Sequence, residues 1–177
     1  MANDSSAIFE TARSAYEWGR FKRACFDASP LLILPVVSWV LTGKLASMVG
    51  LGSALVICAI VFLWRGQGFG RSVPIGLRFG LIPLGLAHLT RVYGHVCTPS
   101  GCTSLCIPAC TAGGIIAGAL VAHAARKSIS PKLTLFAASG VAFLTGALGC
   151  ACVGFGGVLG LFGGLTVTLI ADRLYRH

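Results

Sequence analysis

The chain has little charge, and almost none of it is acidic. Only 11% of its 177 residues are charged, and Asp and Glu together number 5, whereas a soluble domain typically carries about 25% charged residues. Apolar residues make up 55% of the sequence. This balance excludes an intrinsically disordered chain, which needs low hydrophobicity and high net charge.

The familiar catalytic signatures are also missing. The sequence contains no Walker loop, nucleophile elbow, HExxH motif or dinucleotide fingerprint placed after a suitable strand. No acidic residue lies at the centre of an apolar run, which removes the usual marker of a proton-coupled carrier or ion pump. We therefore expect no enzymatic activity and assign no catalytic residue.

Long apolar runs are what the sequence does contain. A membrane-spanning helix needs about 17 to 25 mostly apolar residues. Turn residues and charges divide the chain into six candidate spans, at 28–43, 45–64, 73–91, 108–125, 133–149 and 153–171. Arg78 is expected about one turn inside the third span, with its side chain reaching toward the headgroups. The sequence thus predicts an all-α, polytopic membrane protein with one six-helix transmembrane domain over 28–177.

The basic residues predict an orientation. If the N-terminus is cytoplasmic, twelve of the 14 Lys and Arg fall in cytoplasmic segments, and only Lys44 and Arg91 lie outside. Short cytoplasmic loops accumulate Lys and Arg in this way, so both termini are predicted to be cytoplasmic. The net charge of +9 is then explained by topology and by attraction to anionic lipid, and no nucleic-acid partner is expected.

Residues 1–27 are predicted to form a short amphipathic helix before the first span. Glu10 with Arg13, and Glu17 with Arg20, have the spacing of i,i+3 ion pairs, and apolar residues recur near helical spacing at Ile8, Phe9, Ala12, Tyr16 and Phe21. We expect this helix to lie on the inner leaflet. The alternative is that residues 6–26, together with the C-terminal tail, bind a cytoplasmic protein.

Small residues predict how the later helices pack, because close helix association in lipid depends on them. Gly114 and Gly118 form one G-x-x-x-G pair, and Gly156, Gly160 and Gly164 continue this spacing in the last span. We expect tight contact among the last three helices. The alternatives are that such a face lines a permeation path or forms the contact between copies in a homo-oligomer.

Six of the eight cysteines fall in two turns that face outward in this topology: Cys97, Cys102, Cys106, Cys110, Cys150 and Cys152. In an oxidising compartment such cysteines usually form disulfides. Six cysteines permit fifteen pairings, and the sequence does not choose among them. A bond between Cys150 and Cys152 would close a very small ring, which favours bonds from that turn to Cys106 or Cys110.

Reduced thiolates would instead suit a soft metal ion such as Cu or Zn. His88 and His95 lie near the thiols in the sequence and are candidate accessory ligands. The gaps between successive cysteines of the first turn are compatible with a zinc site without being diagnostic of one. A strained and easily reduced bond would suit a third role, in thiol sensing.

These observations favour a non-enzymatic regulatory or accessory membrane protein. Its outer cysteines would be joined in disulfides or sense the external thiol state, and its cytoplasmic face would bind a partner. The alternative is a thiol-based transporter or handler of soft metal ions, which would pass an ion from the first turn through Cys150 and Cys152 to Cys58. A thiol–disulfide oxidoreductase is a third hypothesis, although such enzymes normally present an accessible C-x-x-C, which this sequence lacks.

Overall fold

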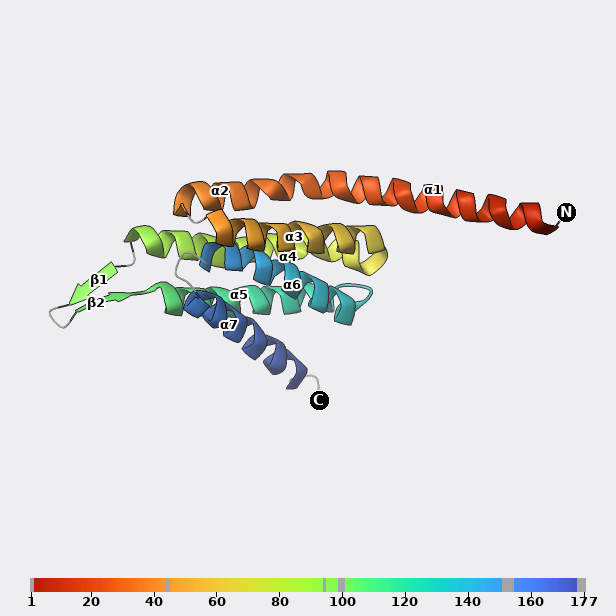
Figure 1. The fold of residues 1–177 in the computed structure, drawn as a ribbon. Coiled ribbons are helices and arrows are strands. Elements are labelled where there is room, and N and C mark those ends of the chain that lie inside the picture. The colour runs from red at the N-terminus through yellow and green to blue at the C-terminus, as the bar shows by residue number, and fades with distance from the viewer. Residues whose placement is uncertain (1, 44, 94, 99–100, 151–154, 175–177) are drawn as a thin grey trace.

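The computed structural model describes residues 2–43, 45–93, 95–98, 101–150 and 155–174. Strands β1 (His95–Thr98) and β2 (Gly101–Ser104) form an antiparallel hairpin. The helices are α1 (Ala2–Ala28), α2 (Ile33–Thr42), α3 (Leu45–Arg65), α4 (Gln67–Tyr93), α5 (Cys106–Arg126), α6 (Pro131–Cys150) and α7 (Phe155–Leu174). The helical class is confirmed. The hairpin, which follows α4, was not predicted (Figure 1).

Five stretches are long and apolar enough to cross a membrane: Phe9–Leu41, Leu45–Arg65, Gly68–Thr90, Ile107–Arg126 and Pro131–Cys150. They correspond to the first five predicted spans, and their length and apolar composition support a helical membrane protein. In α7 the apolar stretch that the structure describes, Gly156–Ala171, is shorter. The sixth span therefore stays a prediction.

The first span has no break between the predicted amphipathic helix and the membrane helix. A short 3-10 turn, Ser29–Leu32, joins α1 to α2, and the backbone of Ala28 and Leu32 stays in the right-handed helical region. Pro30 lies at the start of this turn, where a proline costs no hydrogen bond. The two segments form one long rod that ends at Gly43, whose φ of 71° is left-handed.

The ion pairs predicted on α1 are wrong in register. Arg13 pairs with Glu17 at 3.2 Å, and Arg23 approaches Asp27 at 4.0 Å. Both pairs have i,i+4 spacing, the other separation at which side chains on one helix face meet. Arg20, which was expected to pair with Glu17, donates a hydrogen bond to the carbonyl oxygen of Trp64 on α3 instead.

Backbone contact between α4 and α6 forms the centre of the bundle. A Cβ added at Gly76 would lie 2.5 Å from the carbonyl oxygen of Ala138, and one at Gly80 would lie 2.9 Å from the Cα of Ala142. A Cβ added at Gly149 of α6 would lie 2.9 Å from the Cα of Leu84 on α4. These glycines allow the two backbones to touch, which stabilises helix pairs in lipid through van der Waals contact.

The glycines predicted to mediate packing lie between α5 and α7. A Cβ at Gly114 would lie 2.6 Å from the carbonyl oxygen of Leu161, and one at Gly164 would lie 2.5 Å from that of Thr111. Gly118 faces Thr168 closely, and Gly160 faces the Thr111 side chain. Gly156 has only ordinary contact with Ile107, at 3.6 Å. Four of these five positions thus have little room for a side chain.

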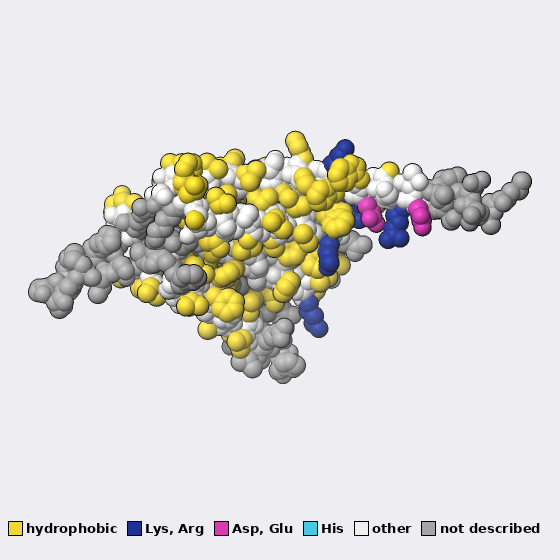
Figure 2. Space-filling model, viewed as in Figure 1, with side chains coloured by type: hydrophobic (Ala, Val, Ile, Leu, Met, Phe, Trp, Pro, Cys, Tyr) yellow, Lys and Arg dark blue, Asp and Glu magenta, His cyan; other side chains and the backbone are white. Residues whose placement is uncertain are grey.

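The bundle has two distinct ends (Figure 1). The hairpin end contains the hairpin, Gly43, the end of α6 and the start of α7. The α1 end contains the start of the chain, the turn at Gly66, the turn between α5 and α6, and the end of α7. Figure 2 shows the coloured charged side chains of this face gathered toward the α1 end, whereas the flank of the bundle is mostly apolar. Lys44, predicted at the opposite end, lies outside the described residues.

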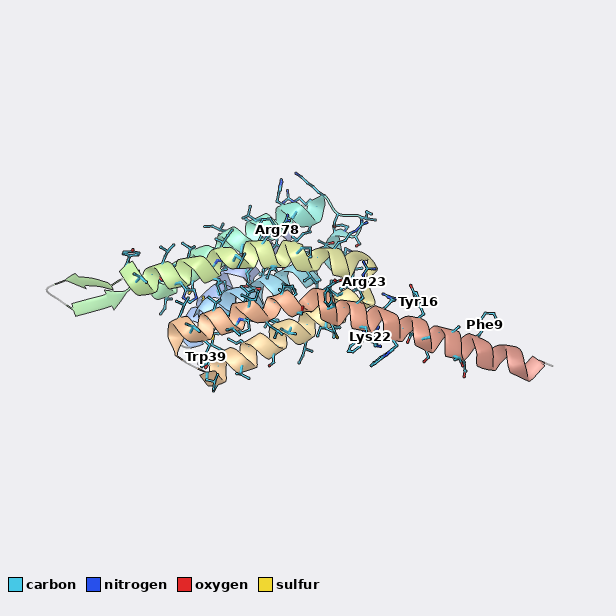
Figure 3. The ribbon with its side chains drawn as sticks, turned by 90° about the horizontal axis from the view of Figure 1, so that it is seen from above. Phe9, Tyr16, Lys22, Arg23, Trp39 and Arg78 are labelled. Atoms are coloured by element: carbon cyan, nitrogen blue, oxygen red, sulfur yellow. The ribbon has the colours of Figure 1, made fainter. Side chains whose placement is uncertain are left out.

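Arg78 does not lie where the sequence predicted. Because α4 begins at Gln67, Arg78 lies about 16 Å inside the helix at 1.5 Å per residue, rather than one turn inside its start. It is exposed on the flank of the bundle (Figure 3). The error comes from the start of the helix: the predicted span began at residue 73, whereas Arg71 and Pro74 both lie within α4.

Candidate functional site

Two thiols lie buried side by side at the hairpin end. Cys110 is on the second turn of α5 and Cys150 is the last residue of α6, and neither has exposed surface. They share an apolar cluster with Ala87 of α4, Ala147 of α6 and Leu161 of α7. Four helices therefore meet around this pair of thiols.

The two thiols interact directly. The side chains of Cys110 and Cys150 lie within hydrogen-bonding range of each other, and no disulfide joins them. An S–S bond is about 2.05 Å long and usually joins Cα atoms about 4.4–6.8 Å apart, so two thiols in mutual contact are candidates for such a bond. Cys110 was one of the two partners that the sequence favoured for Cys150, and the structure brings this pair together.

For His95 and the other predicted cysteines of the hairpin and α5, the structure gives the position of the backbone only. Cys97 of β1 lies directly opposite Cys102 of β2, while His95 lies opposite Ser104. Cys106 is the first residue of α5, one turn before Cys110. The side chains of His95, Cys97, Cys102 and Cys106, and all of Cys152, lie outside the described part of the chain. The opposition of Cys97 and Cys102 follows from a strand register that the sequence did not predict.

A metal site is not formed by the side chains that the structure describes. Among them, no three His, Cys, Asp or Glu residues are grouped so as to hold an ion. His88 is half-buried on α4, next to Ala87 of the thiol cluster. Cys58 lies thirteen residues along α3 from the hairpin end, which is about 20 Å. The described cysteines thus form no continuous path from the hairpin end to Cys58.

Aromatic side chains hold α1 on the bundle at the opposite end. Phe21 packs edge-on against Trp64, with ring centroids 6.1 Å apart, and stacks on Trp18 at 5.8 Å. The guanidinium of Arg20 lies 2.5 Å from the carbonyl oxygen of Trp64. Aromatic residues at this level are typical of a membrane–water interface. Trp64 was not singled out in the sequence, although its position at the end of an apolar run is the signal that marks it.

Beyond this contact, α1 projects from the bundle (Figures 1 and 3). Arg20 lies level with the end of α3, so the residues before Trp18 extend past the last turn of that helix. Phe9 is 77% exposed and Tyr16 is 68% exposed. The projecting part of α1 therefore presents large aromatic side chains without a covering element among the described residues.

No protein-family model, no curated protein and no solved structure matches this chain.

Proposed function

We propose that this protein is a non-enzymatic regulatory protein of the membrane that senses the external thiol–disulfide state. The observation that carries the proposal is the buried Cys110–Cys150 pair, which lies at the opposite end of the bundle from the exposed part of α1. The pair would be the sensing element. The projecting part of α1, within residues 6–26, and the C-terminal tail would bind a cytoplasmic protein.

The length of the first rod supports this placement in the membrane. Phe9–Leu41 comprises 33 residues, which extend about 50 Å as a helix, whereas the hydrocarbon core of a bilayer is about 30 Å thick. The surplus lies at the α1 end, where Trp18, Phe21 and Trp64 would mark the interface. With α7 as the sixth span, both termini are cytoplasmic, and the thiol pair belongs to the outer side.

Oxidation of the pair has a defined chemistry. Cys110 and Cys150 would form one S–S bond by exchange with a soluble disulfide, which takes up two electrons and two protons and leaves as two thiols. The new bond would pull α5 and α6 together at a point where α4 and α7 also pack. Because α6 also contacts α3, and α3 carries α1, the shift would change how α1 is presented.

Photo-cross-linking tests this proposal. A photoreactive phenylalanine analogue is placed at Phe9 of the full chain in cells, and adducts are compared under oxidising and reducing external conditions. Phe136 of α6, which is 73% exposed on the flank of the bundle, is the matched control position. We expect one cytoplasmic protein to be cross-linked from position 9 in a redox-dependent manner, and none from position 136.

The variant Cys110→Ser, Cys150→Ser should remove the redox dependence and leave membrane insertion unchanged. Adducts from position 9 that do not respond to redox conditions, or that respond equally in this variant, would overturn the proposal. Stoichiometric metal in the purified, reduced protein would favour the metal-handling alternative instead.

A further inference from the structure

The hairpin between α4 and α5 contains a second pair of cysteines in exact opposition. In the strand register, Cys97 is the partner of Cys102, with Val96 opposite Thr103 on one side and Thr98 opposite Gly101 on the other. Directly opposed residues of antiparallel strands have Cα atoms about 4.5 or 5.5 Å apart, depending on the type of pair. Both separations fall within the range that a disulfide bridges without backbone movement.

Among the described residues, the backbone of the hairpin has little contact with the helices. Each strand has only four residues, and the hairpin projects from the end of the bundle (Figure 1). Apart from the pairing of its own strands, its main contact is with the adjoining α4. An isolated two-stranded hairpin is marginally stable at best in water, so a hairpin here needs a covalent link or a partner.

The hairpin cysteines lie close in the chain to the buried thiol pair. Cys110 and Cys150 have no exposed surface, so a soluble disulfide reaches them only when the helices around them open transiently. The chain enters α5 from the hairpin, and Cys102 lies four residues before the first residue of that helix. The hairpin is therefore the nearest preceding element that carries thiols.

We propose that Cys97 and Cys102 form a disulfide across the hairpin, made by exchange with a soluble disulfide. The two thiols give up two protons and two electrons, one S–S bond forms between them, and the soluble disulfide leaves as two thiols. The bond holds β1 to β2, and its reduction releases the hairpin. This inference rests on the proposed function only in placing the hairpin on the oxidising side of the membrane.

Mass mapping of the purified full chain in detergent tests the bond. Trypsin cleaves after Arg91 and Arg126 and leaves a peptide, 92–126, that contains four cysteines. The background Cys106→Ser, Cys110→Ser leaves only Cys97 and Cys102 in it. After equilibration with oxidised glutathione, alkylation and digestion without reductant, we expect this peptide to lack alkyl groups and to be lighter by two hydrogens. After reduction it should carry two alkyl groups.

A shift of one residue provides the matched control. The variant Cys102→Ser, Thr103→Cys in the same background keeps two cysteines in the peptide but moves one to the opposite face of the hairpin, because side chains alternate along a strand. We expect roughly tenfold less oxidised peptide in the same glutathione buffer, because the bond would be strained. Equal oxidation of both variants, full alkylation of the in-register pair, or a covalent dimer of the peptide would overturn the inference.

This experiment and the cross-linking experiment fail independently. The mass of the peptide does not depend on the orientation of the protein or on any partner. The redox response of position 9 is tested in a chain that has both Cys110 and Cys150. The hairpin variants lack Cys110, keep Cys150, and are used only for the mass measurement. An intact hairpin bond with unresponsive cross-links would reject only the proposed function, and the reverse result would reject only the hairpin bond.

Discussion

At the scale of single residues, the close helix pairs depend on glycine at positions where backbone faces backbone. A Cβ at Gly164 would lie 2.5 Å from the Thr111 carbonyl oxygen and 2.9 Å from the Ile115 nitrogen. Neither atom can move without displacing α5. At Gly163, one position earlier, nothing lies within 4 Å. Neighbouring glycines of one helix therefore differ in whether they tolerate a methyl group.

Gly164→Ala should lower the free energy of unfolding by about 1–3 kcal/mol, the usual cost of overpacking. Gly163→Ala should be neutral or slightly stabilising, because alanine is the better helix former by about 0.5–1 kcal/mol. Thermal unfolding of the two variants in the same detergent measures the difference. Equal melting of the two variants would show that α5 and α7 do not touch at Gly164.

The sequence predicted the close glycine contacts of α5 but not those of α4. Gly114 and Gly118 are visible because they lie in an uncharged run with repeated spacing. Gly76 and Gly80 have the same spacing but flank Arg78, and a charge within the run obscures the pattern of an apolar packing face. Because a long arginine can point outward from the face opposite a glycine pair, one helix can carry both. Only the relative rotation of α4 and α6, which is a tertiary property, identifies the buried face.

At the scale of elements, only the second half of α1 is attached to the bundle, where Ala24 and Ala28 are buried. Phe21 and Arg20 both meet Trp64, and beyond them α1 has no covering element in the described part of the chain. Local opening requires little free energy where few contacts are lost. The aromatic contact should therefore control how firmly this element is attached to the bundle.

Trp64→Leu should loosen α1 without unfolding the bundle. An aromatic pair contributes about 0.5–1.5 kcal/mol beyond its buried area, so amide hydrogen exchange over residues 16–28 should accelerate roughly two- to tenfold. Trp39→Leu is the control, because Trp39 is partly exposed on α2 at the other end. Acceleration that also extends through α6, or equal behaviour of the two variants, would contradict this local role of Trp64.

The sequence predicted the bounds of the helices more accurately than the structure of the connections between them. The apolar runs locate α3, α5 and α6 to within a few residues, because length and hydropathy determine a span. The first rod was divided at Asp27, since charge and Pro30 suggested an interface there, yet Asp27 lies within α1 and the 3-10 turn continues the helix through Pro30. The hairpin was missed because His95–Thr98 and Gly101–Ser104 are too short to show strand periodicity.

At the scale of the whole molecule, the order of the helices places the hairpin and the buried thiol pair at one end and the basic turns at the other. The hairpin, Cys110 and Cys150 lie at the end where α4 finishes and α5 begins. Ile129, 92% exposed, lies in the turn between α5 and α6 at the opposite end. The two ends are separated by the length of α5, about 30 Å at 1.5 Å per residue. A bilayer of that thickness would divide them.

Single-cysteine variants of a cysteine-free chain should reveal this division. Under the proposed topology, a membrane-impermeant thiol reagent should label Cys102 in intact cells, kept in reducing medium. Ile129→Cys should be labelled only after the membrane is permeabilised. The same pair of variants in permeabilised cells controls for intrinsic reactivity. Labelling of position 129 but not 102 in intact cells would reverse the orientation and move the thiol pair to the cytoplasmic side.

Under the proposed function, the Cys110–Cys150 pair should also make the stability of the whole molecule depend on redox conditions. A bond between them closes a loop of about 40 residues, for which the chain-entropy relation gives about 4 kcal/mol of stabilisation in the absence of strain. The protein should therefore melt at a higher temperature in oxidised than in reduced glutathione. Cys110→Ser should remove this part of the difference, whereas Cys58→Ser, on α3, should retain it. If Cys110→Ser keeps the full difference, the stabilising bond lies elsewhere and the buried pair is not the sensing element.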